Sequence, residues 1–189
     1  MPSSRNSANR SRAATPRKFK RLREVFEGHA TMLIVLQDFP DPDAIAAASA
    51  LKELGRKLGA IQTSLACSGL VGRAENRALV RYLGLNLLKM DKLDAGNFDL
   101  VAMVDTQPGT GNNGLPVEHV PDIVIDHHPI RPATRKARFF DIRGRYGSTS
   151  TILYEYMEEA GIDIEIPLAT ALAYGIRSDT SDQIGRAHV

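Results

Sequence analysis

The sequence of 189 residues has one cysteine, no tryptophan and few aromatic residues, which make up 6% of the chain. Because Cys67 has no second cysteine to pair with, a small scaffold held together by internal disulfides is excluded. No apolar run approaches the roughly 20 residues needed to cross a bilayer. We therefore expect a cytoplasmic protein without a membrane span, stabilised by one apolar core for which this length suffices.

Acidic residues are absent from the first 23 positions, which carry eight arginines and lysines. Residues 1–18 are rich in serine, asparagine and arginine and contain almost nothing to bury, which predicts a disordered basic tail. Such a tail could bind nucleic acid through its charge, but a solvated tail is the simpler interpretation.

Helical and strand patterns alternate along residues 19–182, which we expect to form one domain. Apolar segments of strand length occupy residues 31–37, 61–67, 98–105, 121–126 and 137–142. Helical spacing and end signals predict helices over residues 19–28, 43–59, 73–84, 149–161 and 167–180. This alternation is typical of an α/β fold, here with a mainly parallel five-stranded sheet flanked by helices.

Carboxylates follow two of the predicted strands at their carboxyl ends, where parallel sheets bind ligands. Asp41 and Asp43 flank Pro42 after the first strand, and Asp105 ends the third. Two carboxylates this close raise each other's pKa unless a cation lies beside them. The alternative is that Asp43 caps the following helix, Asp41 is solvated and Asp105 caps a turn.

The fourth predicted strand ends in the segment "IVIDHHP", with Asp126, His127 and His128. Neighbouring histidines point in different directions, so one could bind a metal while the other faces a substrate. Asp126 could orient one imidazole from behind. Asp179, in "GIRSDT", is either a further ligand or a turn residue. Many oxygen ligands with few nitrogens favour Mn²⁺ or Mg²⁺ over Zn²⁺, and two such ions could clamp a phosphate and activate a water.

In this order, the segments "QDFPDPD", "VDT", "DHHP" and "GIRSDT" resemble the motifs of the DHH phosphoesterase superfamily. The resemblance covers roughly residues 30–182. Members of that superfamily include single-strand-specific exonucleases, nano-RNases that also dephosphorylate pAp, cyclic-dinucleotide phosphodiesterases and family II inorganic pyrophosphatases.

The resemblance implies a centre of two manganese ions, with magnesium possible. Asp105 would bridge both ions, while Asp43, His127 and Asp179 would complete one of the two sites. His128 would contact the scissile phosphate, so His128 and Asp105 are the expected catalytic residues. A water would attack the phosphorus, without a covalent enzyme intermediate.

The second ion site departs from the family pattern. Asp41 would belong to it, but the histidine that the family places three residues before Pro40 is Gln37 here. An amide oxygen binds a hard cation more weakly than imidazole binds manganese, so we expect a looser second ion, with Asp38 as a possible substitute ligand.

Four polar residues are candidate substrate contacts. Arg73 and Asn76 lie at the start of a predicted helix, where a phosphate could be drawn, although a solvated helix start explains them equally well. Ser148 and Thr149 offer hydroxyl groups, and helix capping is their alternative role.

We expect a C-terminally truncated fragment, in which residues 183–189 are a non-native tail and the smaller DHHA1 domain of the resembling proteins is lacking. The predicted function is manganese-dependent hydrolysis of phosphate esters in short nucleotides, namely oligoribonucleotides, pAp or cyclic-dinucleotide products, with weak activity in the fragment. The alternatives are a family II-like inorganic pyrophosphatase and a non-catalytic nucleotide-sensing module. A homodimer is also expected.

Overall fold

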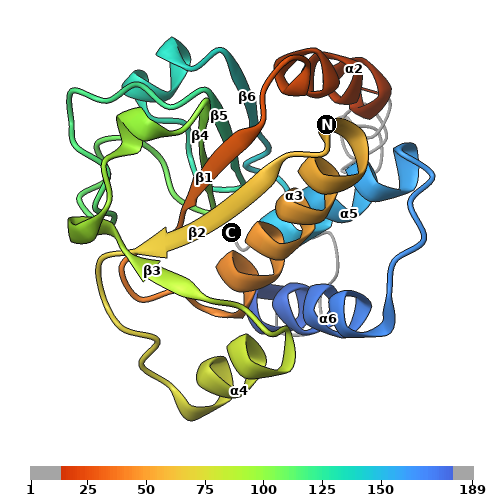
Figure 1. Cartoon of the computed structure of the whole chain (residues 1–189). Coiled ribbons are helices and arrows are strands. Elements are labelled where there is room, and N and C mark those ends of the chain that lie inside the picture. Colours follow the sequence, from red (N-terminus) through yellow and green to blue (C-terminus); the bar gives the residue numbers. More distant parts are fainter. Residues whose placement is uncertain (1–13, 181–189) are drawn as a thin grey trace, which may run out of the picture.

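A computed structural model describes residues 14–180 and arranges them around a six-stranded sheet (Figure 1). The strands lie in the order β3-β2-β1-β4-β5-β6, and every neighbouring pair is parallel. Their bounds are β1 (Thr31–Val35), β2 (Gln62–Cys67), β3 (Leu87–Lys89), β4 (Leu100–Val104), β5 (Ile123–Asp126) and β6 (Phe139–Ile142). The predicted α/β class with a parallel sheet flanked by helices is confirmed.

The count of five strands is wrong by one, because β3 was not predicted. It has three residues, "LLK", and pairs with β2 at the edge of the sheet. All three are only partly buried. A segment this short carries no period that distinguishes a strand from a turn, so its pairing decides its structure.

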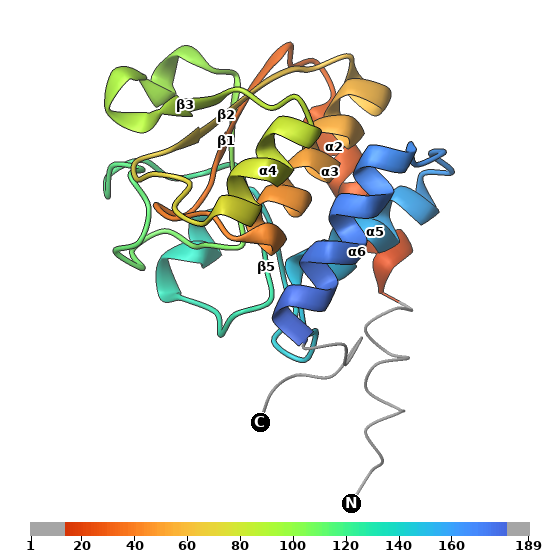
Figure 2. The ribbon, with the colours of Figure 1, turned by 90° about the horizontal axis from the view of Figure 1, so that it is seen from below.

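One face of the sheet is covered by helices, as the view in Figure 2 shows for α3, α5 and α6. The helices are α2 (Thr15–Phe26), α3 (Pro42–Gly59), α4 (Ala74–Tyr82), α5 (Thr149–Glu159) and α6 (Ile166–Thr180). The other face is covered by loops and three short 3₁₀ turns, η1 (Met90–Lys92), η2 (Ala95–Asn97) and η3 (Pro132–Lys136). None of the helices among residues 14–180 is both long enough and apolar enough to span a membrane.

Helix α2 begins at Thr15, four residues earlier than its apolar spacing predicts. Pro16 occupies the first turn, where its missing N–H costs no hydrogen bond, and the Thr15 hydroxyl donates to the Glu155 carboxylate at 2.8 Å. Residues 15–18, expected in the disordered tail, are therefore helical. Residues 1–13 of that tail and the expected non-native segment 183–189 lie outside the described residues.

The apolar core consists of two layers, one on each face of the sheet. In β1 and just beyond it, Met32, Ile34 and Leu36 pack under the helices, whereas Leu33 and Val35 pack under the loops. All five are fully buried, because side chains alternate between the faces of a strand that is covered on both sides.

The strand order reverses between β1 and β4, since β2 and β3 extend the sheet on one side and β5 and β6 on the other. Loops leaving two strands in opposite directions open a crevice at their carboxyl ends, and this is where open α/β sheets bind ligands. The segments after β1, β4 and β5, which carry the predicted site residues, meet at this point.

A buried network of charges joins β6, α5 and α2. Arg143, only 4% exposed, donates to Asp141 at 2.8 Å and to Glu155 at 2.6 Å. Lys18 binds the other oxygen of Asp141, and the Tyr146 hydroxyl donates to Glu155 at 2.8 Å. Burial acts to raise the pKa of Asp141, but Arg143 and Lys18 outweigh it and lower that pKa.

Replacing Arg143 tests this network. We expect Arg143→Met to lower the free energy of unfolding by about 3–5 kcal/mol, because the buried Asp141 and the partly buried Glu155 lose their shared cation. Urea unfolding measures the change, and the exposed neighbour in Arg145→Met serves as the control, with an expected change within about 0.5 kcal/mol. Equal effects of the two substitutions would contradict a stabilising network.

Candidate metal centre

The two carboxylates after β1 have different roles. Asp41 is the N-cap of α3, where its Oδ1 accepts from the Ala44 N–H at 2.9 Å, and Pro42 takes the first helical position. Asp43 is fully buried and accepts from the N–H groups of Thr149 and Ser150 at 2.7 and 2.8 Å. The alternative that gave Asp43 the capping role is therefore wrong: Asp41 caps α3, whereas Asp43 binds the first turn of α5.

Asp105 follows β4 in a left-handed backbone conformation, with a φ of 57°. A residue other than glycine rarely adopts this conformation, and such strain is typical of functional sites. Asp105 is 3% exposed, and its carboxylate accepts from the Thr149 hydroxyl at 2.9 Å, while the Gln37 amide lies 3.5 Å from its other oxygen. The strained turn directs the carboxylate towards α5 and the loop after β1.

The His127 ring faces three carboxylates. Its Nδ1 lies 3.2 Å from the Tyr146 carbonyl oxygen, so Nδ1 carries the proton and Nε2 is left with its lone pair. Nε2 lies 3.4 Å from Asp179, 3.5 Å from Asp105 and 4.0 Å from Asp43. This nitrogen is buried and accepts no hydrogen bond from any residue among 14–180. An unpartnered imidazole nitrogen among carboxylate oxygens fits a divalent cation.

Asp126 holds the second histidine. Its Oδ1 accepts from the His128 ring Nδ1 at 2.8 Å and from the backbone N–H of His127 at 2.7 Å. Burial acts to raise the pKa of Asp126, but the contacts from His128 and Gln107 outweigh it and lower that pKa. The His128 side chain is 56% exposed, so Nε2 is the nitrogen available to a bound phosphate.

Gln107 is a residue of the site that sequence reasoning missed. Its amide nitrogen donates to Asp126 at 2.6 Å, and its amide oxygen accepts from the Arg131 N–H and the Thr134 hydroxyl, both at 2.8 Å. The only signal in the sequence is its place two residues after Asp105. A buried glutamine needs hydrogen-bond partners for both ends of its amide group. Gln107 therefore fixes the position of the Asp126 carboxylate, which lies behind His128.

Asp179 lies in the last turn of α6 and is not the turn residue of the alternative interpretation. The carboxyl end of a helix carries a partial negative charge, which makes it an unfavourable place for a carboxylate. Its side chain is 22% exposed and close to His127. A cation at the centre would remove this penalty.

Burial of several carboxylates, with the repulsion between them second, dominates the electrostatics of the centre. Burial, followed by the charge of Asp179, raises the pKa of Asp43 to about 6. Burial, together with the charges of Asp43 and Asp41, raises the pKa of Asp105 well above its ordinary value. Burial opposes protonation of His127, but Asp179 and Asp43 outweigh it and raise its pKa. The protein alone would hold protons here, and a divalent cation would replace them.

The structure brings most of the predicted ligands together. Asp43, His127 and Asp179 form one group whose ligand atoms lie within 4.8 Å of one another. The other such group contains His127 again, with Asp105, Asp126 and His128. Asp41 belongs to neither group, and the predicted second site with Gln37 lies at the flank of the centre.

Three of the four residues predicted to contact substrate form hydrogen bonds with other groups of the protein. Asn76 is buried and donates to the Pro40 carbonyl oxygen at 3.2 Å, whereas Arg73 is exposed before α4. The Ser148 hydroxyl caps α5 by accepting from the Thr151 N–H at 3.2 Å, and the Thr149 hydroxyl donates to Asp105. These contacts position the two loops, and binding of substrate by these residues stays a prediction.

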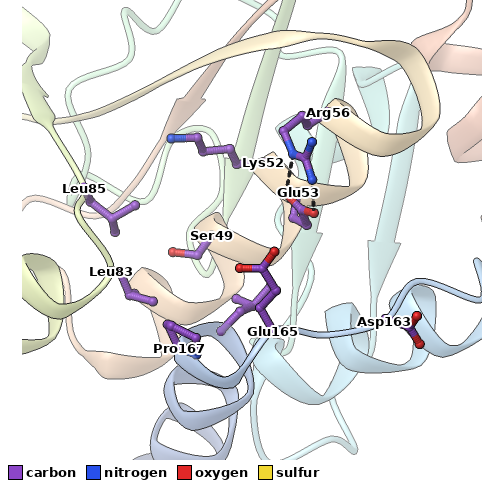
Figure 3. A pocket seen from close by; sticks show the side chains of 10 residues that line it. Ser49, Lys52, Glu53, Arg56, Leu83, Leu85, Asp163, Glu165 and Pro167 are labelled. Atoms are coloured by element: carbon purple, nitrogen blue, oxygen red, sulfur yellow. Dashed lines mark hydrogen bonds and ion pairs between the residues drawn. The ribbon is translucent and has the colours of Figure 1, made fainter.

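A hollow of about 450 Å³ lies away from this centre, on the helical side of the sheet (Figure 3). Figure 3 shows Leu83 and Leu85 on one side of it and the side chains of α3 on the other. Two of its lining charges neutralise each other, because Arg56 donates twice to Glu53, at 2.6 and 2.7 Å. Neither group of candidate ligands among residues 14–180 includes a residue of this hollow, so we place the chemistry at the sheet edge.

Comparison with known families identifies the same region. The model of the family described as "DHH family, N-terminal domain" matches residues 31–176. The uncharacterized protein MJ1633 of Methanocaldococcus jannaschii is 41% identical over 156 residues, which are 82% of this chain and 31% of that protein. A probable manganese-dependent inorganic pyrophosphatase of Lactiplantibacillus plantarum is 28% identical over 148 residues, covering 75% of this chain and 45% of that protein.

Comparison with solved structures supports the fold. An exopolyphosphatase-related protein from Bacteroides fragilis superposes with a TM-score of 0.64 at 16% identity, over 87% of this chain and 50% of that chain. At this identity the likeness concerns the fold alone. The chain spans between about a third and a half of the length of the three similar proteins described here.

Substituting Asp105 separates the cost of the buried charges from the gain of metal binding. We expect Asp105→Asn to raise the melting temperature of the metal-free protein at pH 7, because a neutral amide replaces a buried ionisable group whose charged form this site opposes. The same variant should lose the stabilisation that Mn²⁺ gives to the unsubstituted protein, about 2.7 kcal/mol at 100 times Kd. Thermal unfolding in EDTA and in Mn²⁺ measures both effects, with the exposed Asp91→Asn as the control. A variant that is less stable in EDTA and still responds to Mn²⁺ would contradict this centre.

The raised pKa values also predict how stability depends on pH. The pKa of Asp43 is about 6 in the folded chain against an ordinary 3.8, so between these values the folded state binds more protons than the unfolded state. Stability of the metal-free protein therefore falls as the pH rises through this window. The raised pKa of His127 acts with the same sign. In EDTA, we expect the melting temperature to be roughly 5–10 °C higher at pH 5 than at pH 7. Saturating Mn²⁺ should reduce this difference between the melting temperatures at pH 5 and pH 7. A melting temperature in EDTA that is lower at pH 5 than at pH 7 would contradict the predicted pH dependence.

Proposed function

Because this chain belongs to the DHH family, whose N-terminal domain it contains, we propose that it is a metal-dependent phosphoesterase. The observation that carries this proposal is the buried Nε2 of His127, which has no hydrogen-bond partner among the described residues and lies within 3.4–4.0 Å of three carboxylates. Such a set of ligands is built for a cation, and the strand ends of the sheet converge on it.

The donor set suits manganese, with magnesium as a possible replacement. Carboxylate oxygens outnumber imidazole nitrogens, and Cys67 is not part of either ligand group. Asp43, Asp105, His127 and Asp179 would hold one ion, and Asp41 with Gln37 would contribute to a second. When bound, such ions would supply Lewis-acid polarisation of a phosphate and a water of lowered pKa.

The protein's own groups would orient the phosphate and leave the attack to water. His128, held from behind by Asp126, would present its Nε2 to a phosphate oxygen. The hydroxyl groups nearby are already engaged, since Thr149 donates to Asp105 and Ser148 caps α5. A serine or threonine nucleophile would have to break these contacts, which supports a water as the nucleophile.

We propose short nucleotides as the substrates, namely oligoribonucleotides, pAp or products of cyclic dinucleotides. The other enzymatic candidate is an inorganic pyrophosphatase, favoured by the similarity to the Lactiplantibacillus protein described as a probable manganese-dependent inorganic pyrophosphatase. A non-catalytic nucleotide sensor is the candidate from another class, favoured by Gln37 in place of a stronger imidazole ligand. A cytoplasmic location and a homodimer complete the proposal.

A substrate comparison tests the proposed function. With Mn²⁺ present, we expect phosphate release from pAp and a short oligoribonucleotide, and His128→Ala should lower kcat on the order of 100-fold, because one group that contacts the developing charge is lost. Calorimetry should show Mn²⁺ binding by this variant, and His119→Ala, outside the centre, serves as the control. Hydrolysis of pyrophosphate alone would favour the pyrophosphatase, and nucleotide binding without turnover would favour the sensor.

A further inference from the structure

A second hollow, of about 360 Å³, opens beside the metal centre at the outer edge of the sheet. His128 lines it, so the hollow and the centre share one wall. Its other lining residues come from three segments that meet around β6, the last strand of the sheet, and are Lys18, Arg21, Pro129, Ile130, Phe140, Ile142 and Gly144. This volume lies within the range of small-molecule sites.

The walls of this hollow are mainly apolar. Phe140 and Ile142 belong to β6 and are only partly buried, although they pack against the core on the loop face. Ile130, directly after the DHHP segment, is 36% exposed. A planar organic group lying here would remove this apolar surface from water, which favours binding by roughly 25 cal/mol for each Å² covered.

The rim of the hollow is positively charged. Lys18 and Arg21 lie three residues apart on α2, which places them on one face of the helix. Lys18 is anchored by the buried Asp141. Arg21 is exposed and forms no ion pair with another residue of the described chain, so its guanidinium is available for a two-point contact with a phosphate.

We propose that this hollow, which we call the β6 pocket, binds the organic part of the substrate. The base or sugar of a nucleotide would lie against Phe140 and Ile142, and a second phosphate would reach Arg21 while the scissile phosphate contacts His128. This inference rests on the proposed phosphoesterase function and adds to it the surface by which the site would select a nucleotide with a second phosphate group. Pyrophosphate has no organic part to fill the pocket.

Two substitutions alter the pocket without changing the centre. Arg21→Ala removes the cation of the rim. Gly144→Phe fills the hollow, and a Cβ at Gly144 meets only the His127 carbonyl oxygen, at an ordinary distance of 3.8 Å. Arg23→Ala is the matched control, because Arg23 lies on the same helix and is exposed but does not line the pocket.

The experiment compares two substrates, pAp and pyrophosphate, with Mn²⁺ present. We expect Arg21→Ala to raise KM for pAp about tenfold, the effect of losing one charged hydrogen-bonding group. Gly144→Phe should also raise KM for pAp, because the ring occupies the space of the organic part, and both variants should leave kcat within about twofold. Any turnover of pyrophosphate should stay unchanged in both variants, and Arg23→Ala should match the unsubstituted protein on both substrates. Equal losses on the two substrates, or unchanged KM for pAp, would overturn the β6 pocket while leaving the phosphoesterase function intact.

Calorimetric titration with pAp keeps the two proposals separable. If the unsubstituted chain hydrolyses neither substrate, the phosphoesterase function fails, but the pocket still predicts that Arg21→Ala weakens pAp binding about tenfold. Undetectable pAp binding by the unsubstituted chain, or equal affinities for it and for Arg21→Ala, would overturn the pocket as well.

Discussion

The burial of several carboxylates in one place, which also brings their charges close together, is the constraint on which the rest of this structure depends. Asp43 and Asp105 are buried, and the His127 ring lies within 4.0 Å of both and of Asp179. Gathering these charges in a dry site costs free energy, and the raised pKa values of Asp43 and Asp105 express that cost. The apolar core on both faces of the sheet must offset it. A site that opposes folding in this way is more easily understood as a place for a cation than as a stabilising feature.

Local structure reduces the cost by placing Asp41 and Asp43 against fixed dipoles. The Asp43 carboxylate lies at the amino end of α5, where two backbone N–H groups and the positive end of the helix dipole stabilise it. The Asp41 carboxylate lies in the same way at the amino end of α3, where it accepts from the Ala44 N–H. The Tyr146 carbonyl oxygen holds the His127 ring, and the same residue is tied to the Arg143 network through its hydroxyl. The loop between β6 and α5 therefore connects the stability of the domain with the orientation of a ligand.

The parallel sheet explains why the site and the β6 pocket adjoin. All six strands point the same way, so every loop that leaves a strand end emerges at one edge. The metal centre lies where the strand order reverses, between β1 and β4, and His128 extends it towards β6. A substrate bound along this edge can place its phosphate at the centre and its organic part over the last strand. The strands thus fix the distance between the metal centre and the β6 pocket.

The sequence by itself determined the α/β class and the order of the motifs, and it singled out Asp43, Asp105, His127 and Asp179 as candidate ligands, because apolar periodicity and short motifs are local properties. Only the tertiary structure decided what each residue contacts. Asp43 binds N–H groups 106 and 107 positions away, and Gln107 reaches a carboxylate 19 positions away. No local pattern encodes such pairs, nor the pairing that makes a strand of residues 87–89, since each depends on segments that meet only after the sheet has formed.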